Sequence, residues 1–302
     1  MNRGVLWVCA AATLWGTLGI AAKIGFCHGF TPIEAAICRS LSAALLFSIE
    51  SFARGWGPRW VRRDLVQVLL FGIVGVAGLE ASNLLAVEAG GAGFASILLY
   101  TAPAWVALHA RFARGEHLGV RKTIALACAI LGVAGVSAFG SGTGSVSAQA
   151  LGYGLVSGFS YALFYIFGKP IFERLTIASV YAVSFAVAAL VLAPAWRWDV
   201  SRDAIGWASM AYAGLFATYG AYFCYGRGLK LLDPTRASIL ATLEPVVSAV
   251  AATVILHERL APLAWLSGGV VLIGVLLMSG KSRERATLTV EAKPRAQDAR
   301  AT

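Results

Sequence analysis

Charged side chains are scarce in this chain. Only 13% of its 302 residues are Asp, Glu, Lys or Arg, whereas 58% are hydrophobic. An average soluble domain carries roughly 25% charged residues, because its surface must be hydrated. No polar stretch is long enough to form a separate soluble domain. The shortage of charge therefore excludes a soluble enzyme of ordinary composition.

Metal-binding and catalytic signatures are missing as well. The five cysteines lie in or beside apolar segments and lack the C-x-x-C spacing of a metal site. Segment 257–261 lacks the second histidine of a zinc-protease helix, and the glycine-rich run 140–144 lacks the lysine of a phosphate-binding loop. We therefore expect no cofactor, no metal and no enzymatic activity.

Apolar segments about 20 residues long recur from end to end, and this is the length that spans a bilayer. The sequence predicts an all-α integral membrane protein with ten transmembrane helices. Their predicted ranges are 5–26, 32–52, 65–87, 93–112, 123–140, 150–168, 176–196, 204–226, 236–256 and 262–280. The tail 281–302 lacks apolar periodicity and is predicted to be a disordered cytoplasmic extension.

The basic residues are distributed unevenly between the predicted loops. Fourteen of the 25 Lys and Arg residues fall on the side that holds the N-terminus, against three on the opposite side. An excess of positive charge marks the cytoplasmic face of a membrane protein. Both termini are therefore predicted to be cytoplasmic. This uneven distribution explains the net charge of +10, so we expect the lipid bilayer as a partner and no nucleic acid.

An internal repeat divides the chain. The tetrapeptide Ala-Ser-Ile-Leu at 95–98 recurs at 237–240, and the same offset pairs Pro103 with Pro245 and Glu116 with Glu258. Each half holds five predicted spans, an odd number, so the second half must be inverted relative to the first. We expect a first repeat at 1–140, an external linker at 141–149 and an inverted second repeat at 150–280. Inverted repeats are characteristic of secondary transporters, whose substrate site lies between the halves.

These motifs carry a family resemblance. Leu14-Trp15-Gly16, Pro32, Arg39 and the repeated ASIL…P…E-x-L block resemble the EamA-type permeases of the drug/metabolite transporter superfamily. The resemblance covers about 1–280. It implies two inverted five-helix halves and a multi-pass transporter of the bacterial inner membrane that works by alternating access.

Within that superfamily, the aromatic-rich core and the Tyr100…Pro103 segment resemble the YddG-like amino-acid exporters. This narrower resemblance implies export of an amino acid, including aromatic or apolar ones. The alternatives are an exporter of lipophilic drugs or of another metabolite. Outside the transporter class, an integral-membrane enzyme and a passive channel stay open.

Polar groups inside the predicted spans are the candidate site. Glu80 and Asn83 share one face of their helix, and Glu244 directly precedes Pro245. An intramembrane charge costs roughly 2.5–3.5 kcal/mol, so such groups usually face a cavity or a partner. We expect these three to line a substrate cavity and to accept an ammonium group, with protons as a candidate coupling ion at Glu80.

Three further charges, Arg39, Lys23 and Glu34, are candidates for an ion pair or for coupling. The alternative for Arg39 is structural pairing with Glu34 or Glu80. Snorkelling to the membrane surface is the alternative for Lys23, whose ammonium group is otherwise a candidate donor to a substrate carboxylate.

The remaining candidates are prolines and aromatics. Pro103 and Pro245 are predicted hinges or cavity kinks, because each lies mid-span at matching repeat positions; a static kink is the alternative. Trp15, Tyr100, Tyr161 and Tyr165 are predicted to contact the substrate through their rings or hydroxyls. Trp105, Tyr219 and Tyr222 also lie mid-span, and core packing is the alternative for any one aromatic.

Overall fold

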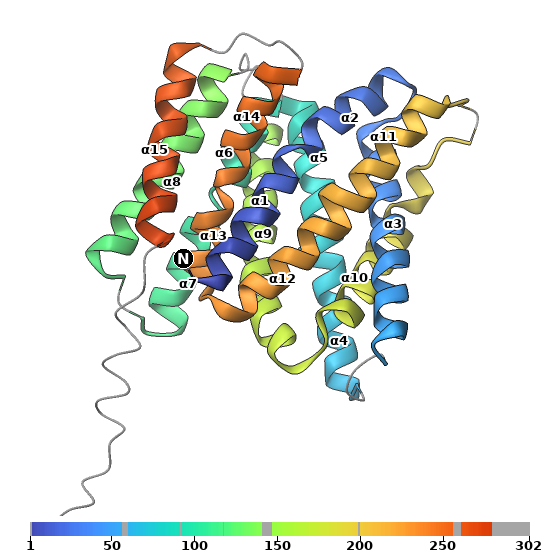
Figure 1. The fold of residues 1–302 in the computed structure, drawn as a ribbon, viewed down its shortest axis with the longest axis horizontal. Coiled ribbons are helices and arrows are strands. Elements are labelled where there is room, and N and C mark those ends of the chain that lie inside the picture. The colour runs from blue at the N-terminus through green and yellow to red at the C-terminus, as the bar shows by residue number, and fades with distance from the viewer. Residues whose placement is uncertain are drawn as a thin grey trace, which may run out of the picture.

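The computed structural model describes residues 2–55, 60–90, 92–116, 118–140, 147–198, 200–255 and 261–279. Within these ranges every regular element is a helix, and the helices form one bundle (Figure 1). The predicted linker and C-terminal tail lie mostly or entirely outside the described residues, as does Glu258.

Most helical elements begin and end within a few residues of the predicted spans. In chain order the α-helices are α1 (Arg3–Gly16), α2 (Leu18–Cys27), α3 (Pro32–Ala53), α4 (Arg62–Leu70), α5 (Leu79–Gly90), α6 (Ala92–Leu99), α7 (Ala102–Ala113), α8 (Val120–Gly140), α9 (Ala148–Arg174), α10 (Ile177–Leu192), α11 (Ala204–Gly214), α12 (Ala221–Leu231), α13 (Pro234–Ala241), α14 (Leu243–Ile255) and α15 (Pro262–Ser279). Two π-helical segments, η1 (Phe71–Gly78) and η3 (Leu215–Gly220), and a 3₁₀ turn, η2 (Ala193–Ala195), complete the set.

Seven helical stretches of the described chain are long and apolar enough to cross a membrane. They are Arg3–Cys27, Pro32–Ala53, Arg62–Ala86, Ala148–Arg174, Ile177–Ala195, Pro234–Ile255 and Pro262–Ser279. The other three predicted spans correspond to α6–α7, to α8 and to α11–η3–α12. The count of ten spans stays a prediction, as does the side on which the termini lie.

Three predicted spans that read as continuous are broken near their middle by a threonine. Thr17, Thr101 and Thr242 each donate a side-chain hydrogen bond to the carbonyl three residues earlier, at 2.7, 2.6 and 2.6 Å. Such a bond competes with the helical backbone pattern and favours a turn. A proline follows two residues after Thr101 and three after Thr242, where it cannot donate to the preceding turn. The spans at 5–26, 93–112 and 236–256 are therefore each divided into two helices, two of them beside the prolines that were predicted to kink them.

The helices pack in a regular set of pairs. α8 packs against α15 on one flank of the bundle, and α3 packs against α10 on the other (Figure 1). Between the flanks α5 packs against α9, α1 against α12 and α7 against α13. Glycine permits the closest approach, because a Cβ atom on Gly132 of α8 would lie 2.6 Å from Val271 of α15. Small residues of this kind let membrane helices approach closely.

Candidate functional site

A cavity of about 120 Å³ lies where the broken helices converge. It is lined by Trp15, Leu18, Arg39, Leu79, Glu80, Asn83, Leu99, Tyr161, Tyr222 and Glu244. Six of the predicted site residues are therefore brought together from α1, α3, α5, α9 and α14, segments far apart in the sequence.

The Arg39 and Glu80 side chains form an ion pair at one wall of the cavity. Arg39 Nη2 lies 3.6 Å from Glu80 Oε1, and the Ser40 hydroxyl donates to Glu80 Oε2 at 3.4 Å. Glu80 is only 8% exposed. Of the two structural partners expected for Arg39, Glu80 is the one observed, and Glu34 is not.

Arg39 is also anchored on its other side, at a π-helical segment. Its Nε donates to Thr218 Oγ1 at 3.0 Å. Thr218 in turn donates to the Ala213 carbonyl five residues earlier, at 2.8 Å. A π-helical turn frees backbone groups that an α-helix would occupy, and such turns are frequent at functional sites. The guanidinium is thus fixed in orientation while its side chain stays 16% exposed.

Glu244 differs from Glu80 in its surroundings. Its side chain is half-buried and lines the cavity. Among the described residues no Lys, Arg or His lies within 4.0 Å of its carboxylate. Glu244 falls in the first turn of α14, where the helix dipole favours negative charge. Glu244 is therefore the carboxylate best placed to receive a cation from solution.

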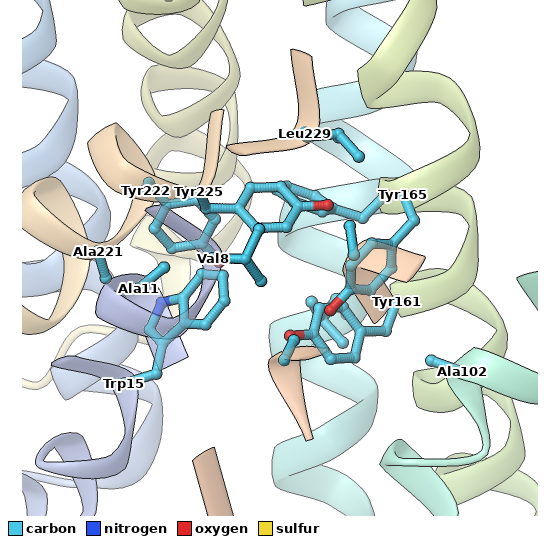
Figure 2. Packing of buried hydrophobic residues seen from close by; sticks show 14 of the residues in the cluster. Val8, Ala11, Trp15, Ala102, Tyr161, Tyr165, Ala221, Tyr222, Tyr225 and Leu229 are labelled. Carbon is cyan, nitrogen blue, oxygen red and sulfur yellow. The ribbon is translucent and has the colours of Figure 1, made fainter. Parts of the chain in front are cut away.

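Aromatic rings also line the cavity. Trp15 meets Tyr222 edge-on with ring centroids 5.1 Å apart, and Tyr161 packs on Tyr165 at 4.9 Å. Figure 2 shows Trp15 and Tyr222 on one side and Tyr161 and Tyr165 on the other. Tyr165 and Tyr100 are buried and are not among the lining residues, although Tyr165 packs on the lining ring of Tyr161.

The two predicted hinge prolines lie beside the helix breaks. Pro103 is in the first turn of α7 and Pro245 in the first turn of α14. Each therefore begins a new helix instead of bending a continuous one. Because proline has no N–H, the carbonyls four residues earlier, at Leu99 and Ala241, lose their helical donor.

Glu34 and Lys23 do not line the cavity. Glu34 is fully buried and is held by the Arg197 and Arg202 guanidinium groups at 2.9 and 2.6 Å. Its carboxylate also accepts from the Thr31 amide at 2.8 Å, as part of a capping box that starts α3. A pairing of Glu34 with Arg39 is therefore wrong, and Glu34 has a structural role at the end of the bundle. Lys23 is exposed on α2.

Sequence reasoning missed Tyr222, Ser40 and Thr218 as members of the site. Tyr222 stood among seven mid-span aromatics with nothing to distinguish it. Ser40 and Thr218 are small polar residues that become informative only when α3 and η3 are placed side by side. No signal in a single sequence marks a π-helical turn at Leu215–Gly220.

The chain matches the model of the EamA-like transporter family twice, over residues 2–138 and again over 149–280. It belongs to that family. The uncharacterized inner membrane transporter YicL of Salmonella typhimurium is 26% identical over 293 residues, which cover 94% of this chain and 98% of that protein. The uncharacterized transporter YwfM of Bacillus subtilis is 27% identical over 298 residues, covering 93% and 95%.

A solved crystal structure shares the fold of this EamA-family chain. It superposes with a TM-score of 0.80 at 17% identity, over 92% of this chain and 98% of that one. The family match and the names of the two relatives identify the protein as a multi-pass membrane transporter rather than an enzyme. The names of its relatives specify no substrate, so the narrower resemblance to amino-acid exporters gains no support from them.

Proposed function

We propose that this transporter carries a small zwitterion, an amino acid with an apolar or aromatic side chain, out of the cell across the inner membrane. The observation that carries the proposal is the composition of the cavity. Three features converge on one small volume: the Glu244 carboxylate, which has no basic group within 4.0 Å among the described residues, the fixed Arg39 guanidinium, and several aromatic rings.

Each part of an amino acid finds a complementary group. Glu244 accepts the ammonium group, and Arg39 with the Asn83 amide receives the carboxylate. Hydrogen bonds to charged groups contribute about 1.5–3 kcal/mol each. A cavity that binds both an ammonium and a carboxylate group therefore prefers a zwitterion to a molecule that bears only one of these charges. Trp15 and Tyr161 receive the side chain. Glu80 acts through Arg39, which it orients.

The cavity volume favours a small solute over a lipophilic drug. Sites for drug-sized ligands measure about 300–1,000 Å³. At about 120 Å³ the cavity is far below that range. Larger aromatic amino acids require the aromatic wall to separate, which the breaks at Thr17, Thr101 and Thr242 allow without distorting a regular helix.

We further propose ten spans in two inverted halves that alternate around this cavity, with both termini cytoplasmic. The double match of one family model supports the repeat. The packing supports it too, because three helix pairs each bring together spans at equivalent positions of the two predicted halves. These pairs are α3–α10, α8–α15 and α7–α13. The π-helical segments η1 and η3 start 144 residues apart, close to the sequence offset of 142.

Two of the polar contacts that join the halves lie at opposite ends of the bundle. The Arg174 guanidinium lies 3.0 Å from Asp64 near the start of α4, and His28 Nδ1 lies 2.6 Å from Asp203 at the start of α11. Each contact links a basic residue at the C-terminal end of one helix, α9 or α2, to an acid at the N-terminal end of another, α4 or α11. Opening one pair while the other stays closed is the step that alternating access requires.

Counterflow into proteoliposomes tests the substrate class. Vesicles loaded with unlabelled leucine should accumulate radiolabelled leucine transiently, whereas isoamylamine and 4-methylpentanoate, which each lack one charged end, should not compete. Competition by isoamylamine as strong as that by leucine would refute zwitterion recognition. Repeating the assay with an imposed pH gradient tests protons as the coupling ion, since a facilitative carrier gives the same exchange with or without it.

A further inference from the structure

A second hollow lies on the outside of the bundle, away from the central cavity. It measures about 640 Å³ and is enclosed by α4 and η1 on one wall and by α9 on the other. Leu70, Val74 and Phe167, which line it, are 54%, 40% and 52% exposed. Such exposure of apolar side chains on a membrane protein identifies a surface that meets lipid.

One end of this groove is polar and basic. Arg63, Gln67 and Arg174 line it there, while the remaining lining residues on both walls are apolar apart from backbone. Arg174 is paired with Asp64 at 3.0 Å, and its Nη2 also donates to the Gln67 side chain. Arg63 is exposed and has no ion pair within the part of the chain that the structure describes. The Arg174–Asp64 pair is neutral, so Arg63 leaves this end with an uncompensated positive charge.

The length of the groove matches one leaflet. From Arg63 to Gly75 the first wall runs twelve residues, which is about 18 Å at the helical rise of 1.5 Å per residue. The second wall, from Leu163 to Arg174, runs about 16 Å by the same measure. Half of the ~30 Å hydrocarbon core is about 15 Å, so an acyl chain that starts at the arginines ends near the midplane.

We propose that this groove binds one anionic phospholipid, with its phosphate at Arg63 and Arg174 and an acyl chain along Leu70, Val74 and Phe167. The basic end of the groove matches the phosphate of such a lipid. The apolar channel, which has the length of one leaflet, matches its acyl chain. Basic pockets between transmembrane helices are known to receive anionic headgroups. A cationic lipophilic drug fits poorly, because the basic end repels it.

The bound lipid also joins the two halves of the transporter. One wall of the groove belongs to the first family match and the other to the second. Lipid binding therefore stabilises the arrangement in which α4, η1 and α9 lie together, the same arrangement that the Arg174–Asp64 pair holds.

Native mass spectrometry of the full chain in detergent tests the site with three probes: palmitoyl-oleoyl phosphatidylglycerol, the matching phosphatidylcholine and inorganic phosphate. We expect phosphatidylglycerol to bind more tightly than phosphatidylcholine, and inorganic phosphate not to bind. Arg63→Gln should weaken phosphatidylglycerol binding about fivefold, since one basic residue near an anionic surface contributes about 1 kcal/mol. Arg111→Gln, an exposed arginine on α7 outside the groove, is the matched control and should bind as the wild type does.

A second variant separates the apolar channel from the charge. Val74→Trp fills the groove and should reduce binding of both phospholipids, whereas Leu45→Trp, on the exposed face of α3, should not. Equal binding of the two phospholipids, or equal loss in Arg63→Gln and Arg111→Gln, would overturn the proposal. Binding of inorganic phosphate at similar strength would do so as well, because it would indicate a simple anion site.

Discussion

Removing the charge of Glu80 should destabilise the protein through Arg39. In Glu80→Gln the Arg39 guanidinium keeps its bond to Thr218 at 3.0 Å but loses the carboxylate 3.6 Å away. Breaking a buried ion pair from one side costs about 3–5 kcal/mol. Arg39 is 16% exposed and keeps one partner, so we expect the lower end, about 3 kcal/mol. That corresponds to a fall in Tm of roughly 5 °C for a chain of this length.

The double variant Arg39→Gln/Glu80→Gln distinguishes pairing from other causes. It removes both charges and leaves two amides that can hydrogen-bond, so its Tm should be higher than that of Glu80→Gln. The coupling between the two changes should exceed about 1 kcal/mol, as for residues in contact. Thermal melts followed by fluorescence-detected size exclusion provide the measurement. Strictly additive effects would refute the pairing argument.

Transport should fall in both the single and the double variant, because each removes the fixed guanidinium geometry that receives the substrate carboxylate. Glu173→Gln is the matched control. Glu173 also pairs with a basic residue, Lys169 at 3.1 Å, but its side chain is 54% exposed. Exposed pairs of this kind contribute about 0–1 kcal/mol, so the control should keep both stability and transport.

Further expectations concern the hinges, the ends of the bundle and the topology. Pro103→Ala and Pro245→Ala should each slow counterflow while leaving membrane insertion unchanged. Wild-type exchange in both variants would show that the helix breaks serve packing only and take no part in transport. Asp203→Ala should lower Tm at neutral pH more than Asp203→Asn, because asparagine still caps α11 through the Gly206 amide. The Gly206 amide, and to a smaller extent the His28 contact, hold the pKa of Asp203 below its ordinary value of 3.8. The stabilisation by the Asp203 carboxylate is therefore present above pH 3.8 and disappears as the pH falls through the lowered pKa. A melt series in which Asp203→Ala differs from the wild type equally at every pH contradicts this. A reporter fused after Ser282 should be cytoplasmic and one in 141–147 periplasmic; termini on opposite faces would rule out an even number of spans.

The fold class and most cavity residues could be predicted from the sequence. Composition alone indicated membrane helices, and the cost of intramembrane charge singled out Glu80, Asn83 and Glu244, all of which line the cavity. Spacing along one helix placed Glu80 and Asn83 on one face. These are local properties, set by hydration and helical periodicity, which a single sequence records.

What could not be predicted depends on contacts between distant segments. The choice of Glu80 over Glu34 as the partner of Arg39 depends on how α3 meets α5. Glu34 is instead captured by Arg197 and Arg202, more than 160 residues away in the sequence. The prolines indicated a kink near Thr101 and near Thr242, but nothing in the sequence marked the break at Thr17, because threonine is common in membrane helices and only its hydrogen bond shows the turn.

Leucine counterflow in Glu244→Gln proteoliposomes tests the central claim most directly. Glu244 has no basic partner at contact distance among the described residues, so the variant should fold and melt as the wild type does. Loss of one charge-assisted hydrogen bond of about 1.5–3 kcal/mol should weaken leucine uptake roughly tenfold or more at low concentration. Wild-type rate and apparent affinity in Glu244→Gln, with Glu173→Gln measured alongside, would contradict the proposal that this cavity holds the substrate ammonium.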